Sequence, residues 1–359
     1  MATIHTPALR SGWTTGACAT AAATAATRAL LTGDFPDPVT IALPEGRKPS
    51  FPLAHRELGR GYAEAGVIKD AGDDPDVTHG ALVIAGVRRL PPGSGLVFRA
   101  GHGVGTVTRP GLPLAPGEPA INPGPRAMIR DNLAALLPCL DLEVTISIPD
   151  GAERAEKTLN GRLGIVGGLS ILGTTGVVVP YSCSAWVHSI HAAVDVARAA
   201  GLTRLAAVTG KASEHGVRTL YPELTDLALI DVGDFMGGLF KYLRRHPVAG
   251  LTVAGGFAKL SKLAAGHLNL HSGRSEVDLN HLAELLHAVG GTVGHVNAVR
   301  NAGTALEVLE IARAAGLPLA NAIAAKAQAV VSRAVNGRVP IEIAVFDRSG
   351  GLVGRSKQG

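Results

Sequence analysis

The segment L-T-V-A-G-G-F-A-K-L-S-K-L-A-A-G, residues 251–266, decides the fold of the second half of the chain. Its first part, 251–256, predicts a buried strand because apolar residues lead into a double glycine, and 257–265 predict a helix. The same pattern recurs on both sides of this segment. Strands are expected at 177–180 (buried), 205–210, 227–232 and 341–346, and helices from Ser182 or Ser184 to Gly201 and at 235–245, 279–289, 305–315 and 319–334. Strands that alternate with helices of this length indicate a parallel sheet.

The first part of the chain shows a different succession of predicted helices and strands. A helix is expected up to about residue 31 and another at 126–137, with strands at 39–43, 81–87, 95–100 and 142–148 between turns rich in glycine and proline. We therefore predict an α/β protein with two domains. Residues 1–150 would form an α+β domain with mixed or antiparallel pairing, and residues 151–359 a Rossmann-like α/β domain with a mainly parallel sheet.

Composition narrows the classes of function. Of the 359 residues, 46% are hydrophobic and 18% charged, which fits a chain with a well-packed core. Aromatic residues make up 4%, too few for base stacking on single strands, and the basic residues behind the net charge of +5 form no run. Neither a membrane span nor a signal peptide is recognised. We expect a cytoplasmic protein that binds neither nucleic acid nor membrane; whether it forms a homo-oligomer stays open.

The three cysteines, Cys18, Cys139 and Cys183, lie far apart and without C-x-x-C spacing. This spacing argues against a zinc site and against a disulfide framework, so no protein-bound metal is expected. Cys18 lies close to the start of a helix, where a thiol can become a nucleophile. The alternative is a small buried residue.

Two T-T-G turns suggest contact with an anionic ligand. In R-S-G-W-T-T-G-A-C-A, Thr14 or Thr15 can cap the helix that follows, and Gly16 lets a ligand approach the backbone. Free N–H groups at such a helix start favour an anion, although an ordinary capped helix would have the same sequence. The second turn comprises Gly173, Thr174, Thr175 and Gly176.

Charged and rigid segments supply further candidates. K-D-A-G-D-D-P-D-V-T-H-G, residues 69–80, holds four aspartates, of which one could act as acid or base oriented by Lys69. An oxygen-ligand metal site and a solvated turn are the alternatives. The proline-rich stretch 109–125 predicts a stiff loop, either the wall of a pocket or a connector, with Arg109 and Arg126 available to meet carboxylates.

Two glycine-rich segments complete the set. Six glycines between 161 and 176, among them Gly167 and Gly168, imply close backbone approach, yet neither nucleotide-binding fingerprint is met. The loop after 257–265 contains His271 and Ser272. A hydrolase is disfavoured because G-x-S-x-G is missing.

Five segments between Leu9 and Asp278 together resemble the CbiD family of cobalamin biosynthesis, the cobalt-precorrin-5B C1-methyltransferases. They are L-R-S-G-W-T-T-G-A-C-A, K-D-A-G-D-D-P-D-V-T, G-L-P-L-A-P-G-E-P-A-I-N-P-G-P-R, G-G-L-S-I-L-G-T-T-G-V-V-V-P and A-K-L-S-K-L-A-A-G-H-L-N-L-H-S-G-R-S-E-V-D. The departures are mild: Trp13 stands where an aromatic such as Tyr is usual, and Leu270 where Thr is usual. The resemblance implies methyl transfer from S-adenosylmethionine to C1 of cobalt-precorrin-5B, an anionic corrinoid precursor, giving cobalt-precorrin-6A, with any cobalt arriving inside the macrocycle.

The resemblance does not identify the site residues, so these are predicted from the chain itself. Ligands of parallel sheets bind beyond the carboxyl ends of the strands, where an acid can hold ribose hydroxyls. The predicted cofactor-binding residues are Gly167, Gly168, Thr209, Gly210, Asp231, Asp234, Gly255 and Gly256. The predicted substrate-binding residues are Thr14, Thr15, Gly16, Lys69, Asp70, Arg109, Arg126, Gly173, Thr174, Thr175, Gly176, His271 and Ser272. Asp73 or Asp74 is predicted to take the proton released after methylation. A non-catalytic corrinoid carrier and a phosphate-loop phosphotransferase are the alternatives.

Overall fold

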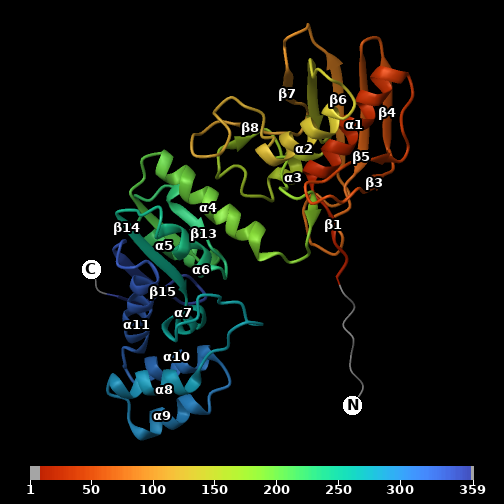
Figure 1. Cartoon of the computed structure of the whole chain (residues 1–359). Helices are drawn as coiled ribbons and strands as arrows, with labels where there is room; N and C mark the ends of the chain where they lie inside the picture. The colour runs from red at the N-terminus through yellow and green to blue at the C-terminus, as the bar shows by residue number, and fades with distance from the viewer. Residues whose placement is uncertain (1–8, 357–359) are drawn as a thin grey trace, which may run out of the picture. The chain divides into compact units, whose positions relative to one another are not determined.

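The computed structural model describes residues 9–356 of the chain (Figure 1). The chain divides into two compact units, Met1–Ser182 and Cys183–Gly359. The segment after residue 150 belongs to the first unit because its short strands pair there. β10 (Ile165–Val166) pairs with β8 (Thr106–Val107), and β11 (Val177–Val178) pairs with β1 (Gly12–Trp13). The compact units thus divide after Ser182, later than the predicted domain boundary.

The first unit is α+β, with a mixed five-stranded sheet. The strands lie in the order β4 (His55–Gly59), β5 (Tyr62–Ile68), β6 (Leu82–Arg89), β9 (Leu142–Ser147) and β7 (Leu96–Ala100). All neighbours are antiparallel except β7 and β9, which are parallel. The predicted mixed or antiparallel pairing is confirmed. The hairpin β4–β5 was not predicted, since Arg56 and Glu57 place charged residues on both faces of β4 and obscure the apolar alternation.

One face of this sheet is covered by α1 (Thr15–Thr32), which begins at the N-cap Thr14 and ends at Gly33. Alanine and threonine make up most of α1, and the small side chains bring its backbone close to Ala63 and Ala65 of the sheet. α2 (Pro123–Ala134) packs against α1. The remaining elements of this unit are β2 (Val39–Thr40), β3 (Ser50–Phe51) and α3 (Gly151–Ala155).

The buried strand predicted at 177–180 is wrong in two respects. Only Val177 and Val178 are extended in a strand, both are half-buried, and Val179 is exposed. The strand pairs with β1 in the first unit rather than joining the parallel sheet. Three valines in a row carry no information about which sheet they join, so local sequence alone could not decide this.

The second unit is built on a mainly parallel sheet, as predicted. β13 (Leu229–Asp231), β12 (Arg204–Val208), β14 (Gly250–Gly256) and β15 (Ile341–Phe346) lie in this order and run parallel, and β16 (Leu352–Arg355) closes the edge antiparallel. In chain order this is 2-1-3-4-5, the strand order of the flavodoxin-like doubly wound fold, with the difference that the fifth strand is antiparallel. Its switch point, where the order of strands reverses, lies between β12 and β14.

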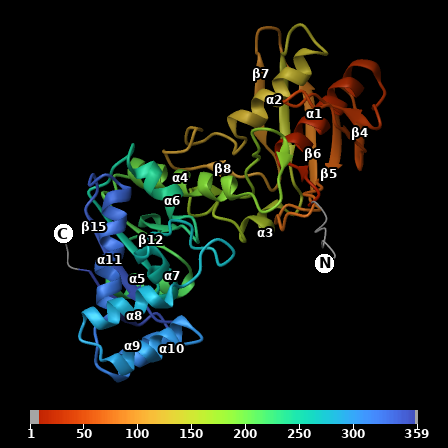
Figure 2. The same cartoon turned by 60° about the horizontal axis from the view of Figure 1, so that its bottom comes forward.

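Helices cover both faces of this sheet (Figures 1 and 2). On one face, α5 (Lys211–Leu220) packs over Ala206, Val208 and Ala254. The alternate residues Leu205, Ala207 and Val253 face the larger core of the other side. That core includes α4 (Cys183–Ala199), α6 (Met236–Leu243), α7 (Phe257–Ala264) and α11 (Leu319–Ala334).

Three further helices, α8 (Leu279–Ala288), α9 (Val293–Arg300) and α10 (Ala305–Ala314), contact one another and extend this core. The 3-10 helix Asp226–Ala228 leads into β13. Helices α5 and α9 were not predicted. Within residues 9–356, none of the helices combines the length and apolar character that crossing a bilayer requires.

Candidate functional site

The structure brings the two T-T-G turns side by side in the first unit. β1 and β11 pair antiparallel, and the Thr14 N–H donates to the Gly176 carbonyl at 3.0 Å. The Thr15 hydroxyl accepts from the Leu172 N–H at 3.0 Å. Two segments more than 150 residues apart thus form one interlocked backbone structure, which the short sequence repeat alone could not prove.

This interlocking also occupies the start of α1. The Gly16 N–H donates to the Leu172 carbonyl at 3.0 Å, and the Ala17 N–H donates to the Thr14 hydroxyl at 3.1 Å. A Cβ on Gly16 would lie 2.8 Å from Pro125, so the group that approaches this glycine closely belongs to α2. Free N–H groups were the reason for predicting an anion at Thr14, Thr15 and Gly16, but the N–H groups of Thr14, Gly16 and Ala17 bind protein groups instead. That Thr14, Thr15 and Gly16 contact the substrate stays a prediction, which free N–H groups at the helix start no longer support.

Gly173 shows how tightly the turns fit. Its φ is +118°, and a Cβ there would lie 2.3 Å from Thr14 Cβ. We predict that Gly173→Ala lowers the free energy of unfolding by about 2–4 kcal/mol, since strain at positive φ and overpacking add. Gly46→Ala is the matched control, because Gly46 has φ +81° and open space around it. Equal losses in urea unfolding of the two variants would contradict the interlocked arrangement.

The acidic loop 69–80 packs against the chain that leads into β1. The Arg10 guanidinium binds Asp70 with both nitrogens, and the Gly72 N–H donates to Asp70 at 2.9 Å. The hydrogen bonds from Arg10 and Gly72 lower the pKa of Asp70 to about 2. Asp73 accepts from the Arg10 N–H at 2.6 Å, and Asp74 accepts from the Tyr181 N–H at 2.7 Å. The loop is therefore fixed by its own carboxylates.

Lys69 does orient an aspartate, but that residue is Asp76. The Lys69 ammonium is 1% exposed and lies 2.6 Å from Asp76 Oδ2, while Asp76 Oδ1 accepts from the Thr78 N–H and hydroxyl. Burial tends to raise the pKa of Asp76, yet Lys69 and Thr78 outweigh it and the pKa lies below its ordinary value. Cys18 is fully buried, and this burial raises its pKa to about 12, which favours the structural interpretation over a nucleophile.

Asp70 should make the first unit sensitive to acid. Because its pKa of about 2 lies below the ordinary 3.8, its contribution is complete above pH 4 and disappears as the pH falls toward 2. Asp70→Asn should therefore lower the urea midpoint relative to wild type at pH 5 to 7, and the gap should close between about pH 4 and 2. The exposed Asp131→Asn serves as control. A gap that does not change over this range would contradict the role assigned to Arg10 and Asp70.

The two predicted arginines differ in what they contact. The Arg126 guanidinium donates to the carbonyls of Ile121 and Pro119 at 2.7 and 3.1 Å and lies over the Phe98 ring, so it braces the proline-rich loop. Arg109 is exposed, and within residues 9–356 no carboxylate forms an ion pair with it. Arg126 also forms an ion pair with Glu118, so of these two arginines it is Arg109 that keeps its guanidinium available to a ligand carboxylate.

Gly167 and Gly168 lie in the first unit, whereas the other predicted cofactor residues lie in the second. A Cβ on Gly168 would lie 2.2 Å from the Gly103 carbonyl oxygen, so the close neighbour of this glycine is again the protein. Gly167 has φ +89° and open space around it. A contact of these two glycines with the cofactor stays a prediction.

In the second unit, the predicted residues gather at the carboxyl edge of the parallel sheet. Thr209 and Gly210 follow β12, and Gly255 and Gly256 end β14, so these pairs flank the switch point. A Cβ on Gly255 would lie 2.9 Å from the Thr209 hydroxyl, so this glycine makes room for that side chain. In folds of this kind, ligands bind at the switch point.

Helices α5, α6 and α7 begin at this edge, and none of the three has a side-chain cap. The first N–H groups of α5 and α7 favour negative charge there, whereas in α6 the Gly237 N–H already donates to the Leu268 carbonyl at 2.9 Å. Gly256, the N-cap of α7, has open space where a Cβ would be. Backbone donors and room for a ligand thus occur together at the end of β14.

Lys259 contacts the chain just after two of the parallel strands, β12 and β13. The Lys259 ammonium donates to the Thr209 carbonyl at 2.8 Å and lies 3.0 Å from Asp234 Oδ1. The contact with Asp234 is an ion pair outside hydrogen-bond geometry, and it supplies the charge partner of this buried oxygen. Asp231 accepts from the Gly233 N–H at 3.1 Å. The carboxylate of Asp231 is therefore bound to its own loop, whereas that of Asp234 can accept a hydrogen bond from a ligand.

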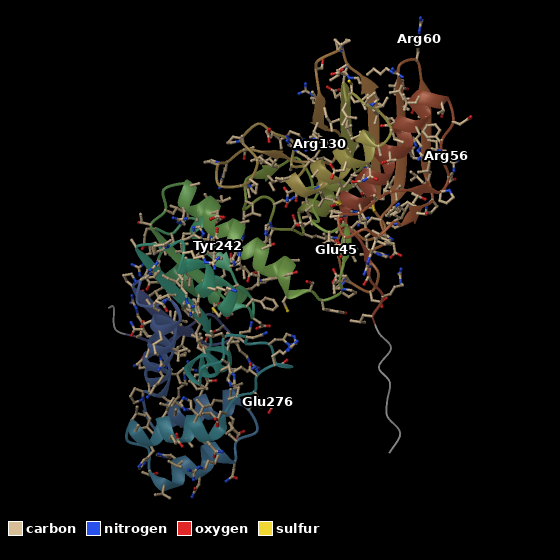
Figure 3. All side chains as sticks on the ribbon, viewed as in Figure 1. Glu45, Arg56, Arg60, Arg130, Tyr242 and Glu276 are labelled. Atoms are coloured by element: carbon tan, nitrogen blue, oxygen red, sulfur yellow. The ribbon has the colours of Figure 1, made fainter. Side chains whose placement is uncertain are left out.

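The loop with His271 and Ser272 adjoins Asp234. The Leu270 N–H donates to the Asp234 carbonyl at 2.9 Å, and the Lys262 ammonium donates to the Leu270 carbonyl at 3.1 Å. His271 and Ser272 themselves are exposed. Glu276, labelled in Figure 3, lies on the same loop.

Sequence reasoning assigned no role to Lys259 or Trp186. Lys259 lies in the first turn of α7, where the helix dipole disfavours a cation, and this position could have signalled a carboxylate partner. Trp186 lies on α4, 42% exposed, within 3.4 Å of the position of a Cβ on Gly233. Its ring pairs with Phe235, with centroids 6.4 Å apart. No local signal indicated that this tryptophan would reach the edge of the sheet.

Comparisons with known proteins agree on one family. The family model described as CbiD matches residues 3–180, and the model described as CbiD, C-terminal domain, matches residues 269–357. A Rhodospirillum rubrum protein named cobalt-precorrin-5B C(1)-methyltransferase is 61% identical over 348 residues, covering 96% of this chain and 97% of its own. Proteins of the same name from Bradyrhizobium and Brucella anthropi are 58% and 56% identical, each over 97% of this chain and over 93% and 95% of their own.

A solved structure matches as well. The crystal structure of a cobalamin biosynthesis protein (cbiD) from Archaeoglobus fulgidus is 26% identical, with a TM-score of 0.39, and the match covers 86% of this chain and 85% of that one. The level of identity to the bacterial proteins, over nearly the whole chain, exceeds what shared fold alone would produce. The chain belongs to the CbiD family.

Proposed function

We propose that this protein transfers a methyl group from S-adenosylmethionine to C1 of cobalt-precorrin-5B in cobalamin biosynthesis. The observation that carries the proposal is the 61% identity to a named cobalt-precorrin-5B C(1)-methyltransferase over 96% of the chain. The methyl group leaves the sulfonium sulfur and bonds to the ring carbon. The products are S-adenosylhomocysteine, the methylated macrocycle cobalt-precorrin-6A and the proton that the reaction releases.

The carboxyl edge of the second unit fits the methyl donor. The Asp234 side chain is 24% exposed at this edge and Lys259 holds its Oδ1, so its Oδ2 can accept from a ribose hydroxyl. Gly210 and Gly256 leave open space, so an adenosyl group can approach the backbone. Trp186 offers an exposed aromatic face for a planar base. When bound, S-adenosylmethionine supplies an electrophilic methyl group.

The residues of this edge would act by orientation. Lys259 holds the Thr209 carbonyl and the Asp234 carboxylate in place, so the acceptor is fixed before the ligand arrives. Methyl transfer to an electron-rich carbon needs alignment and exclusion of water more than side-chain chemistry. This agrees with the burial of Cys18, whose raised pKa disfavours a role as nucleophile.

In the first unit, charged and polar side chains are available to bind the macrocycle that accepts the methyl group. Residues 1–182 hold 16 basic and 16 acidic residues, so the carboxylate arms of a corrin precursor would be bound here by individual guanidinium groups and not by an excess of positive charge. Arg109 is exposed and unpaired within residues 9–356, and the Thr174 hydroxyl is exposed beside the interlocked turns. Asp73 and Asp74 each use one oxygen for a backbone N–H and keep the other for the proton released after methylation.

The proposal is tested by measuring how much S-adenosylhomocysteine forms for each macrocycle consumed. With cobalt-precorrin-5B and S-adenosylmethionine present together, one molecule should form per macrocycle consumed, and almost none should form without the macrocycle. A corrinoid carrier would bind the macrocycle and form none. A phosphotransferase would instead consume ATP with Mg²⁺, but the donors at the start of α1 that it would need bind protein groups.

A further inference from the structure

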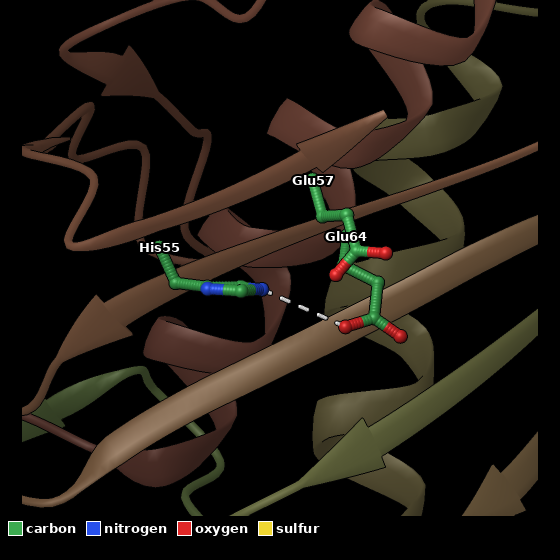
Figure 4. Close-up of side chains that lie close together, drawn as sticks. All are labelled: His55, Glu57 and Glu64. Atoms are coloured by element: carbon green, nitrogen blue, oxygen red, sulfur yellow. Dashed lines mark ion pairs between the residues drawn. The ribbon is translucent and has the colours of Figure 1, made fainter. Parts of the chain in front are cut away.

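A group of metal-ligand side chains lies on the hairpin β4–β5, apart from both regions described above. His55 and Glu57 on β4 and Glu64 on β5 point toward one another (Figure 4). One ligand atom of each lies within 4.8 Å of the other two, and His55 Nε2 is 3.6 Å from Glu64 Oε2. Glu64 alternates with Ala63 and Ala65, which face α1, so the group occupies the opposite face of the sheet.

The two carboxylates form an unfavourable pair on their own. Glu57 and Glu64 are directly opposite in the antiparallel register, where like charges destabilise a sheet. Across the described range, 9–356, neither forms an ion pair with a lysine or arginine. Arg56, between His55 and Glu57 in sequence, pairs with Asp37 instead. Among the described residues, the imidazole of His55 is thus the group that can offset this repulsion, and it does so only when protonated.

The surroundings make room for the group and orient it. Gly86 on β6 lies opposite Glu64, and a Cβ there would be 3.1 Å from Glu64 Oε1. Gly66 lies opposite His55, and its Cβ would be 2.9 Å from that of His55. The Tyr62 hydroxyl donates to Glu57 Oε1 and leaves the second oxygen for another partner. Ligating carboxylates are often oriented by such outer hydrogen bonds.

We propose that His55, Glu57 and Glu64 bind a divalent cation of the zinc class. Ligand atoms around a tetrahedral ion lie about 3.4 Å apart for bonds of about 2.1 Å, so rotation of these long side chains suffices to close the set. One imidazole with two carboxylates suits Zn²⁺ better than Mg²⁺, which prefers oxygen ligands alone. The sequence-based expectation of no protein-bound metal rested on cysteine spacing, and this group contains no cysteine.

The test uses the full chain after treatment with a chelator and titration with ZnCl₂ in a calorimeter. One Zn²⁺ per chain is expected to bind, with affinity reduced by about 10- to 100-fold in Glu64→Gln and by about tenfold in Tyr62→Phe, which removes only the outer hydrogen bond. Glu45→Gln, at an exposed residue of the same unit labelled in Figure 3, should bind as wild type does. MgCl₂ should bind more weakly than ZnCl₂.

Thermal unfolding separates metal binding from folding. Without metal, Glu64→Gln should unfold at the same temperature as wild type or higher, since it relieves the repulsion with Glu57. With Zn²⁺ the unfolding temperature of wild type should rise and that of Glu64→Gln should not. Equal Zn²⁺ affinity in wild type and Glu64→Gln, or binding of Mg²⁺ as tight as that of Zn²⁺, would overturn the proposal.

Discussion

Replacing Asp234 with alanine should weaken the binding of S-adenosylmethionine by about 10- to 100-fold. A hydrogen bond to a charged group contributes about 1.5–3 kcal/mol, and each 1.4 kcal/mol corresponds to a factor of ten. Asp234 is partly exposed at the carboxyl edge of the sheet, and Lys259 fixes its Oδ1, which leaves Oδ2 for the ligand. The measurement is calorimetric titration of the variant and wild type with S-adenosylmethionine.

The matched control for this variant is Glu223→Ala, an exposed carboxylate elsewhere in the second unit. It should bind S-adenosylmethionine as wild type does. Far-UV circular dichroism and the urea midpoint show whether Asp234→Ala is folded. If a folded Asp234→Ala kept the full affinity, the methyl donor would have to bind elsewhere in the chain.

The second large effect concerns stability. Asp76→Asn should lower the free energy of unfolding by about 3–5 kcal/mol, because it leaves the Lys69 ammonium, which is 1% exposed, without its charge partner. The amide oxygen of asparagine can still accept from Thr78, so the loss reports mainly on the charge pair. Urea unfolding followed by circular dichroism measures the loss, with Asp131→Asn as the exposed control.

A double variant separates loss of the pair from damage to the loop. Lys69→Met with Asp76→Asn removes both charges and should recover most of the stability, since replacing a buried ion pair with apolar groups is often neutral. If the double variant were less stable than Asp76→Asn alone, the buried lysine would have to contribute through contacts other than the ion pair.

Much of the second unit was predictable because its elements follow from local pattern. The predicted helix 319–334 has the same bounds as α11, and 279–289 and 305–315 are each one residue longer than α8 and α10. Apolar spacing and glycine stops were sufficient there. Helix α5 was missed because its polar residues and Gly216 weaken the pattern, although Val217 packs onto the sheet.

The site was predictable only in part, because it depends on tertiary contacts between residues that are remote in sequence. Thr209, Gly255 and Asp234 lie at one edge because parallel strands end together, a consequence of the alternation of strands and helices along the chain. The start of α1 could not be judged in this way. Whether its N–H groups are free depends on Leu172, a residue remote in sequence whose carbonyl binds Gly16. Local sequence specifies the donors of a helix, but not which acceptor reaches them.

The most direct test of methyl transfer to C1 is the mass and labelling of the macrocycle after reaction with S-adenosylmethionine carrying a labelled methyl group. The account predicts that the purified protein adds one labelled methyl group to cobalt-precorrin-5B, and that nuclear magnetic resonance assigns it to C1. A macrocycle recovered with unchanged mass, or labelled at another carbon, would contradict it.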